Sequence, residues 1–245
     1  MTSLPQGLDG VDVVVLAGGL GTRLRGVLTD RPKVLAPILG QPFLNHLARG
    51  LARQGASRLI LCLGHLAETV IEHVGTRPVD GVEFVPVIER EPLGTAGAVR
   101  LARPTVTSDP ALVLNGDSLV VADLAGFADR HRAAGVEASL LAVRVGDTTR
   151  FGRLDVNAAG FIERFSEKNP DAQGEGLISA GIYLFSAALL DRLMLMPGPS
   201  LERDVLQVLP AGSIRAEVTE GAFIDIGTPE SLIEAEAVVS AHFAA

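Results

Sequence analysis

Residues 11–33 of the chain, VDVVVLAGGLGTRLRGVLTDRPK, constrain its fold more than any other segment. An apolar, β-branched run ends there in a loop that contains three glycines. A buried strand that ends in glycines lets an anionic ligand approach bare backbone N–H groups, which is how many α/β proteins hold a phosphate chain. Two cations, Arg23 and Lys33, follow the loop and can neutralise such phosphates. The segment therefore predicts an α/β fold with a nucleotide site at the end of its first strand.

Two better-known phosphate loops do not fit these residues. A P-loop of the form G-x-x-x-x-G-K-[ST] requires a Lys-Ser or Lys-Thr pair, which this segment lacks. The dinucleotide fingerprint G-x-G-x-x-G is met by Gly19 and Gly21 but fails at Leu24. A tight turn that uses glycine for positive φ would explain one or two of the glycines. It does not explain three glycines followed in order by a threonine and two cations, so we prefer the phosphate-binding interpretation.

Composition narrows the class of ligand. With 245 residues, 47% of them hydrophobic, the chain is long enough for one large domain. Its net charge of −8 and the absence of a basic stripe argue against nucleic acid as a partner. The one cysteine, Cys62, lies in an apolar run and is expected to be a buried, inert thiol. Residues 1–10 do not resemble a signal peptide, and no apolar run reaches the roughly 20 residues of a membrane span, so we expect a cytoplasmic protein with no membrane partner.

The first half of the chain alternates between predicted strands and predicted helices. Apolar and β-branched runs predict strands at residues 11–17, 58–64, 82–87, 111–114 and 138–145. Apolar residues at helical spacing predict helices at residues 43–54, 66–74, 95–102 and 124–134. This alternation predicts a mostly parallel mixed sheet with helices on both of its faces.

The second half of the chain is richer in strands. Strands are predicted on either side of a turn at residues 157–160, at residues 177–185 and at residues 223–226. A helix is predicted at residues 200–209 with Ser200 as its N-cap. A final helix is predicted to open at Thr228, with the following proline in its first turn. No repeat or linker divides the chain, so we expect a single domain over residues 1–245.

Two aspartates end separate apolar strands. Asp117 follows LVLNG, and Asp225 lies much later in the chain within FIDIGTP. Ligands of open α/β sheets bind beyond the carboxyl ends of the strands. Two carboxylates from such strand ends can hold one Mg²⁺ ion together with substrate phosphates. Either aspartate alone would more often be a turn or helix-cap residue, but together with the glycine loop they favour a magnesium site.

The motif G-G-x-G-T-R-L, followed by Lys33 within R-P-K, resembles the signature of the sugar-phosphate nucleotidylyltransferases. The resemblance implies a single-domain, Rossmann-like fold of the nucleotide-diphospho-sugar transferase type, with a small β-rich part that binds the sugar. It implies Mg²⁺ as cofactor and transfer of a nucleoside monophosphate from an NTP to a sugar 1-phosphate, with release of pyrophosphate. The catalytic residues that it implies are Arg23, Lys33, Asp117 and Asp225, with the two aspartates as metal ligands.

Further segments match the same family. EPLGTAGA at residues 91–98 can bring its backbone against a nucleobase, although it is also typical of a helix start with Thr95 as N-cap. RFG at 150–152 resembles a step beside the sugar, and the Glu167-Lys168 pair resembles residues that hold the sugar hydroxyls and the sugar phosphate. The implied nucleotide-binding residues are Leu16, Ala17, Gly18, Gly19, Gly21, Thr22, Arg23, Glu89, Pro92, Gly94, Thr95 and Asp117. The implied sugar-phosphate-binding residues are Asn115, Gly152, Glu167, Lys168, Ser179 and Gly181.

One position departs from the family pattern. Residues 179–183, SAGIY, resemble a strand usually written Asn-x-Gly-x-Tyr, so Ser179 stands where an amide usually binds sugar hydroxyls. A hydroxyl is shorter and makes fewer hydrogen bonds than an amide, so we expect an altered sugar pocket. Within the single domain, the resemblance assigns mainly nucleotide binding to residues 11–135, mainly sugar-phosphate binding to 136–228, and a C-terminal helix to 229–245.

The resemblance also narrows the substrates. Residues 91–98 look most like guanylyltransferases, while the length, residues 30–33 and residues 225–229 look most like the bacterial D-glycero-α-D-manno-heptose 1-phosphate guanylyltransferases. GTP and this heptose phosphate are therefore preferred, and a homodimer is left open. Mannose 1-phosphate guanylyltransferases, and uridylyl- or thymidylyltransferases for other hexose phosphates, are the alternatives. A catalytically silent nucleotide-sugar-binding regulator is an alternative of another class, disfavoured because the catalytic cations and aspartates are all present.

Overall fold

The computed structural model describes residues 7–19, 21, 24, 28, 31–149, 151–166 and 174–243. The strands are β1 (Asp12–Leu16), β2 (Pro37–Ile38), β3 (Gln41–Pro42), β4 (Arg58–Leu63), β5 (Glu83–Ile88), β6 (Ala111–Asn115), β7 (Ser118–Val120), β8 (Ala138–Val145), β9 (Arg153–Val156), β10 (Ile162–Ser166), β11 (Gly176–Phe185), β12 (Ile214–Thr219) and β13 (Phe223–Asp225). The α-helices are α1 (Phe43–Ala52), α2 (Ala67–Thr76), α3 (Gly94–Ala102), α4 (Leu124–Ala134), α5 (Ala187–Leu193) and α6 (Pro229–His242). Shorter helical turns are η2 (Lys33–Leu35), η3 (Arg103–Thr105), η4 (Leu201–Val205) and η5 (Leu206–Val208).

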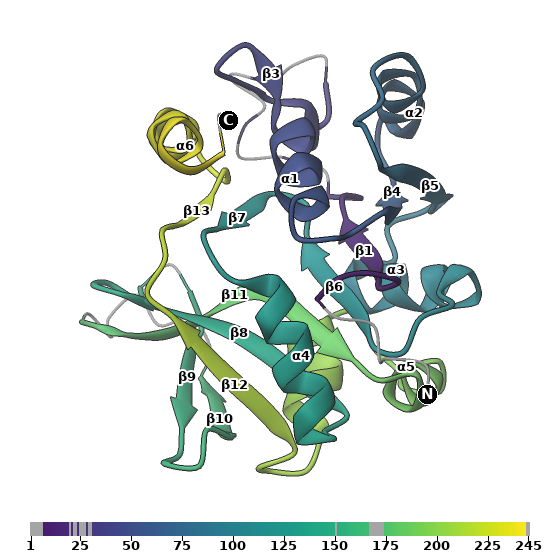
Figure 1. Cartoon of the computed structure of the whole chain (residues 1–245). Helices are drawn as coiled ribbons and strands as arrows, with labels where there is room; N and C mark the ends of the chain where they lie inside the picture. The colour runs from purple at the N-terminus through teal and green to yellow at the C-terminus, as the bar shows by residue number, and fades with distance from the viewer. Residues whose placement is uncertain are drawn as a thin grey trace.

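The strands form a nine-stranded mixed sheet with the order β10-β9-β11-β6-β1-β4-β5, in which β8 pairs with β11 and β12 pairs with β8 (Figure 1). The neighbours β6, β1, β4 and β5 are parallel to one another. Strand β11 runs antiparallel to β6, β8 and β9 and connects the parallel part to the β-rich part. The mixed sheet and its alternation with helices confirm the predicted fold class.

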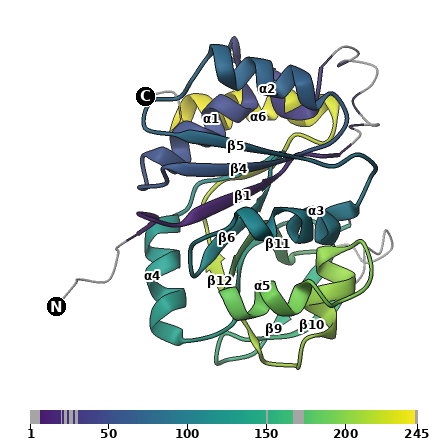
Figure 2. The same ribbon diagram turned by 90° about the vertical axis from the view of Figure 1, so that its right-hand side faces the viewer.

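Each central strand is buried on both of its faces, which is why its sequence is a continuous apolar run. In β1, Val13 and Val15 face one core and Val14 faces the other, and all three are fully buried. Helices α1, α2, α4 and α6 contribute to the first core, and α3 and α5 contribute to the second. Figure 2 shows α1, α2 and α6 on one side of β1, β4 and β5, with α3 on the other. The prediction of helices on both faces is confirmed.

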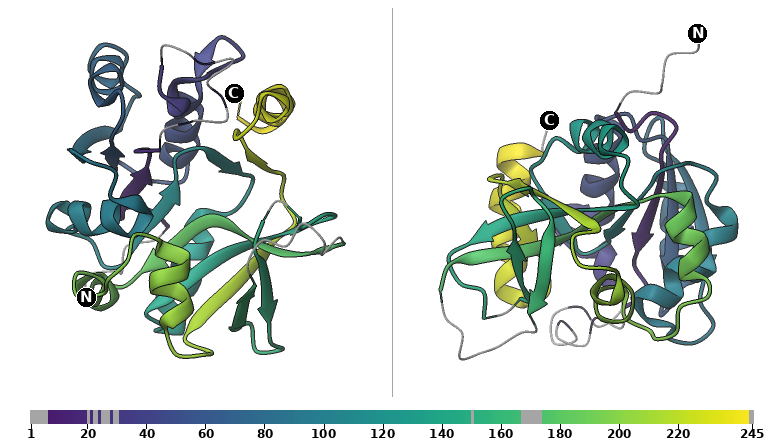
Figure 3. Two further views of the ribbon diagram at one scale, coloured as in Figure 1. Left: turned by 180° about the vertical axis from the view of Figure 1, so that it is seen from behind. Right: turned by 90° about the horizontal axis from the view of Figure 1, so that it is seen from below.

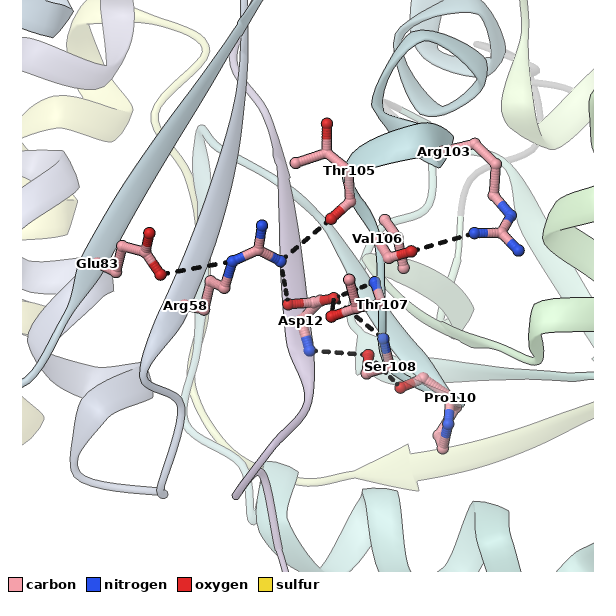
Figure 4. A network of polar contacts seen from close by, with 9 residues as sticks. All are labelled: Asp12, Arg58, Glu83, Arg103, Thr105, Val106, Thr107, Ser108 and Pro110. Atoms are coloured by element: carbon pink, nitrogen blue, oxygen red, sulfur yellow. Dashed lines mark hydrogen bonds and ion pairs between the residues drawn. The ribbon is translucent and has the colours of Figure 1, made fainter.

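A partly buried ion pair joins the amino ends of the parallel strands β1 and β4 (Figure 4). Asp12 of β1 accepts hydrogen bonds from Arg58 Nη1 at 2.6 Å, from the Ser108 backbone N–H at 3.0 Å and from Thr107. Arg58 also donates to the Thr105 carbonyl at 3.1 Å. Burial by itself raises the pKa of Asp12, but the hydrogen bonds from Thr107, Arg58 and Ser108 outweigh it and lower the pKa below its ordinary value. The ionised carboxylate fixes the start of β1, at the opposite end from the glycine loop.

Where a predicted helix or strand has a counterpart in the structure, its boundaries agree with the observed ones to within a few residues. One helix differs from a regular α-helix in its type. Residues 201–208 form a π-helical turn followed by a 3₁₀ turn, so the predicted helix is present but is not a regular α-helix. Its predicted N-cap is confirmed, because the Ser200 hydroxyl accepts a hydrogen bond from the Arg203 N–H at 3.2 Å. Strands β7 and β12 and helix α5 have no counterpart among the predicted elements.

The final helix begins as its sequence predicts. Thr228 caps α6 in a reciprocal capping box with Ser231, and Pro229 occupies the first turn. Helix α6, in yellow, lies next to α1 in both views of Figure 3. The ring of Phe243 packs so closely on Gly50 of α1 that a Cβ there would meet it at 2.9 Å. Within the described part of the chain, no helix is both long enough and apolar enough to cross a membrane.

Candidate active site

The glycine loop follows β1 at the carboxyl ends of the parallel strands, as the sequence predicts. The Ala17 N–H donates to the Cys62 carbonyl at 2.9 Å, which extends the pairing of β1 with β4 by one residue. Gly18 lies so close to the Glu89 carboxylate that a Cβ at this position would overlap it. A side chain at Gly18 would therefore displace the Glu89 carboxylate, and the loop backbone and Glu89 together form one edge of the site.

Two short strands bring Asp117 and Asp225 together. Asp117 directly precedes β7, and β13 pairs antiparallel with β7 so that Asp225 lies opposite Ser118. The Ile226 N–H donates to the Asp117 carbonyl at 3.0 Å, which extends the same ladder past the two acids. Pairing of β7 with β13 thus places two carboxylates from distant parts of the sequence at one point.

The ammonium group of Lys33 joins these two carboxylates. Lys33 Nζ lies 2.6 Å from Asp117 Oδ2 and 3.4 Å from Asp225 Oδ1. The Lys33 side chain is 12% exposed, so its charge has little freedom to leave the acids for solvent. The structure therefore gathers three of the four predicted catalytic residues into one charged cluster.

The oxygen atoms of this cluster suit a hard divalent cation. Asp117 and Asp225 offer only carboxylate oxygens, which Mg²⁺ prefers, and they leave positions for phosphate and water oxygens. Among the residues that the structure describes, no group of three His, Cys, Asp or Glu side chains is arranged to enclose a metal ion. The pair therefore fits an ion that is held largely by a phosphate ligand better than it fits a permanent structural metal.

A first pocket, with a volume of about 410 Å³, lies between the glycine loop and the start of α3. Its size is in the usual range for a small-molecule site. The predicted nucleotide-binding residues that line it are Leu16, Ala17, Gly18, Gly19, Gly21, Glu89, Pro92, Gly94, Thr95 and Asp117. Lys33 and Asn115 share this lining. The structure thus brings together every described residue that the sequence assigns to the nucleotide.

The entry to α3 is held by the segment before η4. Gly94 has a φ of 72° and packs against Pro199, so a side chain would not fit there. The Thr95 hydroxyl accepts a hydrogen bond from the Leu201 N–H at 2.8 Å, and α3 begins at Gly94 without a side-chain cap. The Ala96 N–H donates to the Pro199 carbonyl at 2.9 Å. The interpretation of Thr95 as an N-cap is therefore wrong, and Thr95 instead connects α3 to η4.

A second pocket, of about 340 Å³, shares Asn115 and Asp117 with the first and also includes Asp225. The predicted sugar-phosphate-binding residues that line it are Asn115, Gly152, Ser179 and Gly181. Gly181 has a φ of 70°, and a Cβ there would overlap the Asn115 amide. Two pockets therefore meet at Asp117, beside the charged cluster.

Four predicted site residues lie outside the residues that the structure describes. They are Thr22, Arg23, Glu167 and Lys168. Their roles stay predictions from the sequence.

Two aromatic residues of the segments quoted above, Phe151 and Phe223, also line the second pocket and pack edge to face with ring centroids 5.9 Å apart. The pocket contains further side chains that the sequence analysis does not single out. Glu202, Arg203 and Gln207 add polar groups to the lining. Glu202 accepts a hydrogen bond from Tyr183 Oη at 2.7 Å. Tyr183 belongs to the family-like segment 179–183 and could have been singled out there, whereas no sequence signal marks Glu202, because its position depends on tertiary packing.

The single cysteine takes no part in the chemistry of the site. Burial raises the pKa of the Cys62 thiol to about 12, and the Glu89 carboxylate adds to the shift. Cys62 is 4% exposed, and its Sγ lies 3.6 Å from the Ala98 carbonyl. A protonated, enclosed thiol is a poor nucleophile, so the expectation of an inert cysteine is confirmed.

Comparisons with known proteins agree with this geometry. The family model described as nucleotidyl transferase matches residues 12–241. The mannose-1-phosphate guanylyltransferase of Mycobacterium tuberculosis is 35% identical over 93% of the chain, which spans 64% of that relative's length. The D-glycero-alpha-D-manno-heptose 1-phosphate guanylyltransferase of Aneurinibacillus thermoaerophilus is 31% identical over 92% of the chain and 97% of the relative.

A solved structure resembles the fold over nearly its whole length. The crystal structure of HddC from Yersinia pseudotuberculosis superposes with a TM-score of 0.82 and 36% identity, covering 93% of the chain and 98% of HddC. HddC has also been solved in complex with GMP-PN, with the same TM-score of 0.82 and 35% identity.

Proposed function

Because the chain belongs to the nucleotidyl transferase family, we propose that it transfers a guanylyl group from GTP to a sugar 1-phosphate and releases pyrophosphate. The observation that carries this proposal is the cluster of Lys33, Asp117 and Asp225 where two pockets meet. Transfer between two polyanions requires a binding site for each and fixed charge where their phosphates approach. The two pockets and the cluster supply these requirements.

Two relatives support GTP and a heptose phosphate as the preferred substrates. HddC, which this chain covers over 98% of its length, has been solved with GMP-PN, whose name denotes a guanine nucleotide. The Aneurinibacillus relative, matched over 97% of its length, is named for D-glycero-alpha-D-manno-heptose 1-phosphate. Mannose 1-phosphate is the second candidate, because the mycobacterial relative shares 35% identity.

The substrates themselves supply the reacting groups of the proposed reaction. An oxygen of the sugar 1-phosphate, already ionised at neutral pH, attacks the α-phosphorus of GTP and forms a new P–O bond. The bond from the α-phosphorus to the bridging β-phosphate oxygen breaks, and pyrophosphate leaves. No proton has to be removed from the nucleophile, so no general base is needed. The protein holds the phosphates in line and offsets their charge.

Each part of the site has a task in this mechanism. The backbone N–H groups of the glycine loop would hold the triphosphate in the first pocket. Lys33, placed where the pockets meet, would contact phosphate oxygens at the point of transfer. For the residues outside the described part of the chain, the resemblance assigns the leaving pyrophosphate to Arg23, the sugar phosphate to Lys168 and the sugar hydroxyls to Glu167.

Asp117 and Asp225 would hold a Mg²⁺ ion together with the triphosphate. Their oxygen-only donor set and their closeness to one another, shown by the contact of each with Lys33 Nζ, support this assignment. The chemistry supplied by the bound ion would be neutralisation of the negative charge that develops at the α-phosphate.

A regulatory subunit without catalysis is the less favoured function. The charged cluster is complete in Lys33, Asp117 and Asp225, and a protein that only bound nucleotide-sugar would not need it. The cytoplasmic location expected from the sequence stays a prediction, and the homodimer stays open.

Pyrophosphate release tests the proposed function. The assay crosses GTP, UTP, dTTP, CTP and ATP with heptose, mannose, glucose and N-acetylhexosamine 1-phosphates, with and without Mg²⁺. We expect release only with GTP, the heptose phosphate and Mg²⁺. Release with another pair would keep the mechanism and replace the substrates. No release from protein that still binds a nucleotide-sugar would favour the regulator.

A further inference from the structure

In one wall of the second pocket, Ser179, which the sequence assigns to the sugar, is joined to two residues that have no role assigned to them so far, Tyr183 and Glu202. Glu202 of η4 and Ser179 of β11 both line this pocket. Tyr183 contacts both of them, is 2% exposed and is the only tyrosine of the chain. The three side chains form one chain of hydrogen bonds, from Ser179 through Tyr183 to Glu202. A ligand that binds Ser179 or Glu202 therefore contacts a group whose orientation depends on the other two.

The protons in this line have one consistent arrangement. Tyr183 Oη lies 2.7 Å from Glu202 Oε1 and 3.1 Å from Ser179 Oγ. Because an ionised carboxylate only accepts, the single phenolic proton goes to Glu202, and the Ser179 hydroxyl donates to Tyr183 Oη. Burial, helped by the charge of Glu202, raises the pKa of Tyr183 well above its ordinary value, so the phenol keeps its proton.

Ser179 therefore has no proton left for a ligand. Its Oγ also accepts a hydrogen bond from the Gly181 N–H at 3.1 Å. This contact lies in a β-bulge, because the register of β11 against β8 shifts between Ser179 and Ile182. Bulges re-aim side chains and are common beside active sites. An asparagine at this position could donate and accept, whereas Ser179 can only accept from a ligand.

The backbone that carries Glu202 is fixed independently of Tyr183. Leu201 and Val205, on either side of Glu202, are 2% and 0% exposed and anchor η4 in the second core. The Leu201 N–H donates to Thr95 Oγ1 at 2.8 Å, which ties η4 to α3. Such π-helical turns often occur at functional sites. Glu202 itself is exposed and accessible from the pocket.

We propose that Glu202 and Ser179, coupled through Tyr183, form an acceptor-only wall that binds a sugar hydroxyl able to donate a hydrogen bond. Glu202 and Ser179 contact the sugar, and Tyr183 is a positioning residue that sets the orientation of both. The wall discriminates against sugars that lack a donating hydroxyl at that position. This inference rests on the proposed function, because it takes the second pocket to hold the sugar 1-phosphate.

Steady-state kinetics of four proteins test the wall: wild type, Glu202→Gln, Tyr183→Phe and the control Glu163→Gln. Glu163 is an exposed carboxylate of β10 that does not line the second pocket. We expect Glu202→Gln to raise KM for the sugar 1-phosphate about 10-fold, the scale of a hydrogen bond to a charged group, with KM for GTP unchanged. Tyr183→Phe keeps the ring stacked on Phe185 at 5.7 Å and is expected to raise the same KM about 3-fold. The control should match wild type.

Sugar analogues identify the hydroxyl that the wall binds. Single-deoxy and single-deoxyfluoro analogues of the preferred sugar 1-phosphate both lack the O–H donor, while the fluorine retains a weak acceptor. At one ring position both analogues should raise the wild-type KM by a similar factor of about 10. The same increase should be absent in Glu202→Gln, because an interaction that is already lost cannot be lost again.

The outcomes separate this inference from the proposed function. A folded wild type that releases no pyrophosphate with any substrate pair would overturn both. An active wild type whose Glu202→Gln variant keeps its KM for the sugar phosphate would overturn the acceptor wall alone. The wall is also overturned if Glu202→Gln raises KM for the sugar 1-phosphate but each deoxy and deoxyfluoro analogue still raises the KM of this variant as much as it raises that of the wild type. Thermal unfolding checks each variant, and if Tyr183→Phe does not fold, the Glu202 and analogue measurements decide.

Discussion

At the scale of single residues, the charges of Asp117 and Asp225 are what the proposed chemistry depends on. Asparagine keeps the shape of each side chain and removes its charge. We expect Asp117→Asn and Asp225→Asn each to lower turnover about 10²-fold or more with folding intact, on the scale of losing one charge-stabilising group. Pyrophosphate release at saturating Mg²⁺ measures this effect.

The matched control for these variants is Asp80→Asn. Asp80 is an exposed carboxylate in the turn before β5 and lines neither pocket. Its replacement should leave turnover near normal. If both site variants also turned over at a near-normal rate, the assignment of Asp117 and Asp225 as metal ligands would be wrong.

Cys62 provides a chemical probe of burial at one residue. Its pKa of about 12 and its enclosed position predict that iodoacetamide does not label the folded protein at pH 8. In urea, the same reagent should add one carbamidomethyl group per chain, because the sequence contains one cysteine. Mass spectrometry of both samples counts the labels. Rapid labelling of the folded chain would mean that the thiol is accessible.

The sequence predicts individual site residues well where a local pattern marks them. The glycines of the first loop and the aspartates at two strand ends are marked by the apolar runs before them. The contact of Lys33 with both aspartates is not marked, because it depends on the pairing of β7 with β13. The interpretation of Thr95 as an N-cap is wrong for the same reason, because it depends on tertiary contacts: the Thr95 hydroxyl accepts a hydrogen bond from the Leu201 N–H, which lies far along the chain.

At the scale of elements, Asp12 fastens β1 to β4 and to the segment before β6. We expect Asp12→Asn to lower the free energy of unfolding by roughly 3 kcal/mol at pH 7, the scale of losing one partner of a buried ion pair. Urea unfolding measures it. Asp155→Asn, which removes a pair with the exposed Arg164, is the control and should cost at most about 1 kcal/mol.

The Asp12 contribution also has a defined pH dependence. Because its pKa is lower in the folded chain, the unfolded chain takes up this proton first as the pH falls. The stabilisation is complete above the ordinary carboxyl pKa of about 3.9 and is lost as the pH falls through the lower folded pKa. The gap between wild type and Asp12→Asn should therefore stay constant from neutral pH to about pH 5 and shrink below pH 4. A gap that shrinks already at pH 6 would contradict this account.

His131 attaches α4 to β8 and, like Asp12, has a lowered pKa in the folded chain, but the form that folding favours is the neutral ring and not a charged group. Burial lowers the pKa of His131 from 6.5 to about 4, and its Nδ1 lies 2.8 Å from Ser139 Oγ. Between these two values the unfolded chain binds a proton that the folded chain does not, so stability falls as the pH drops from 6.5 to 4. The slope is at most about 1.4 kcal/mol per pH unit.

Unfolding in urea at several pH values tests His131. His131→Asn should remove this slope between pH 6.5 and pH 4, and replacement of the exposed His65 by Asn should leave it in place. The same slope in wild type and in His131→Asn would assign the acid sensitivity to other groups.

The sequence predicts the elements that a continuous apolar run or a recognisable motif marks, and it misses β2, β3, β7, β12 and α5. Strands β1, β4, β6 and β8 are buried on both faces, so each is a recognisable apolar run. Strand β7 has only three residues and no pattern of its own; β13 is equally short, but the FIDIGTP segment around it marks it. In η4, Leu201 and Val205 have the spacing of an α-helix, but the connection to Thr95 accompanies a wider π-helical turn. The conformations of β7 and η4 therefore depend on tertiary contacts, which the local sequence does not show.

At the scale of the whole molecule, the two pockets and the last strand make one binding unit. We expect GTP with Mg²⁺, at 100 times its dissociation constant, to raise the free energy of unfolding by about 2.7 kcal/mol. Asp225→Asn should retain only part of this gain, because the loop still binds the triphosphate. Thermal unfolding with GTP, with Mg²⁺ and with both measures it independently of turnover. A gain from GTP that does not depend on Mg²⁺ would argue against a metal at the cluster.

Strand β13 reaches the site late in the chain, and this order has a consequence during synthesis. A nascent chain that has left the ribosome as far as β12 already contains the glycine loop, Lys33 and Asp117, but not Asp225. In the proposed mechanism, the charged cluster is therefore complete only when β13 has emerged and has paired with β7. A protease that cut between β12 and β13 would break the chain between Asp225 and the other two residues of the charged cluster, Lys33 and Asp117.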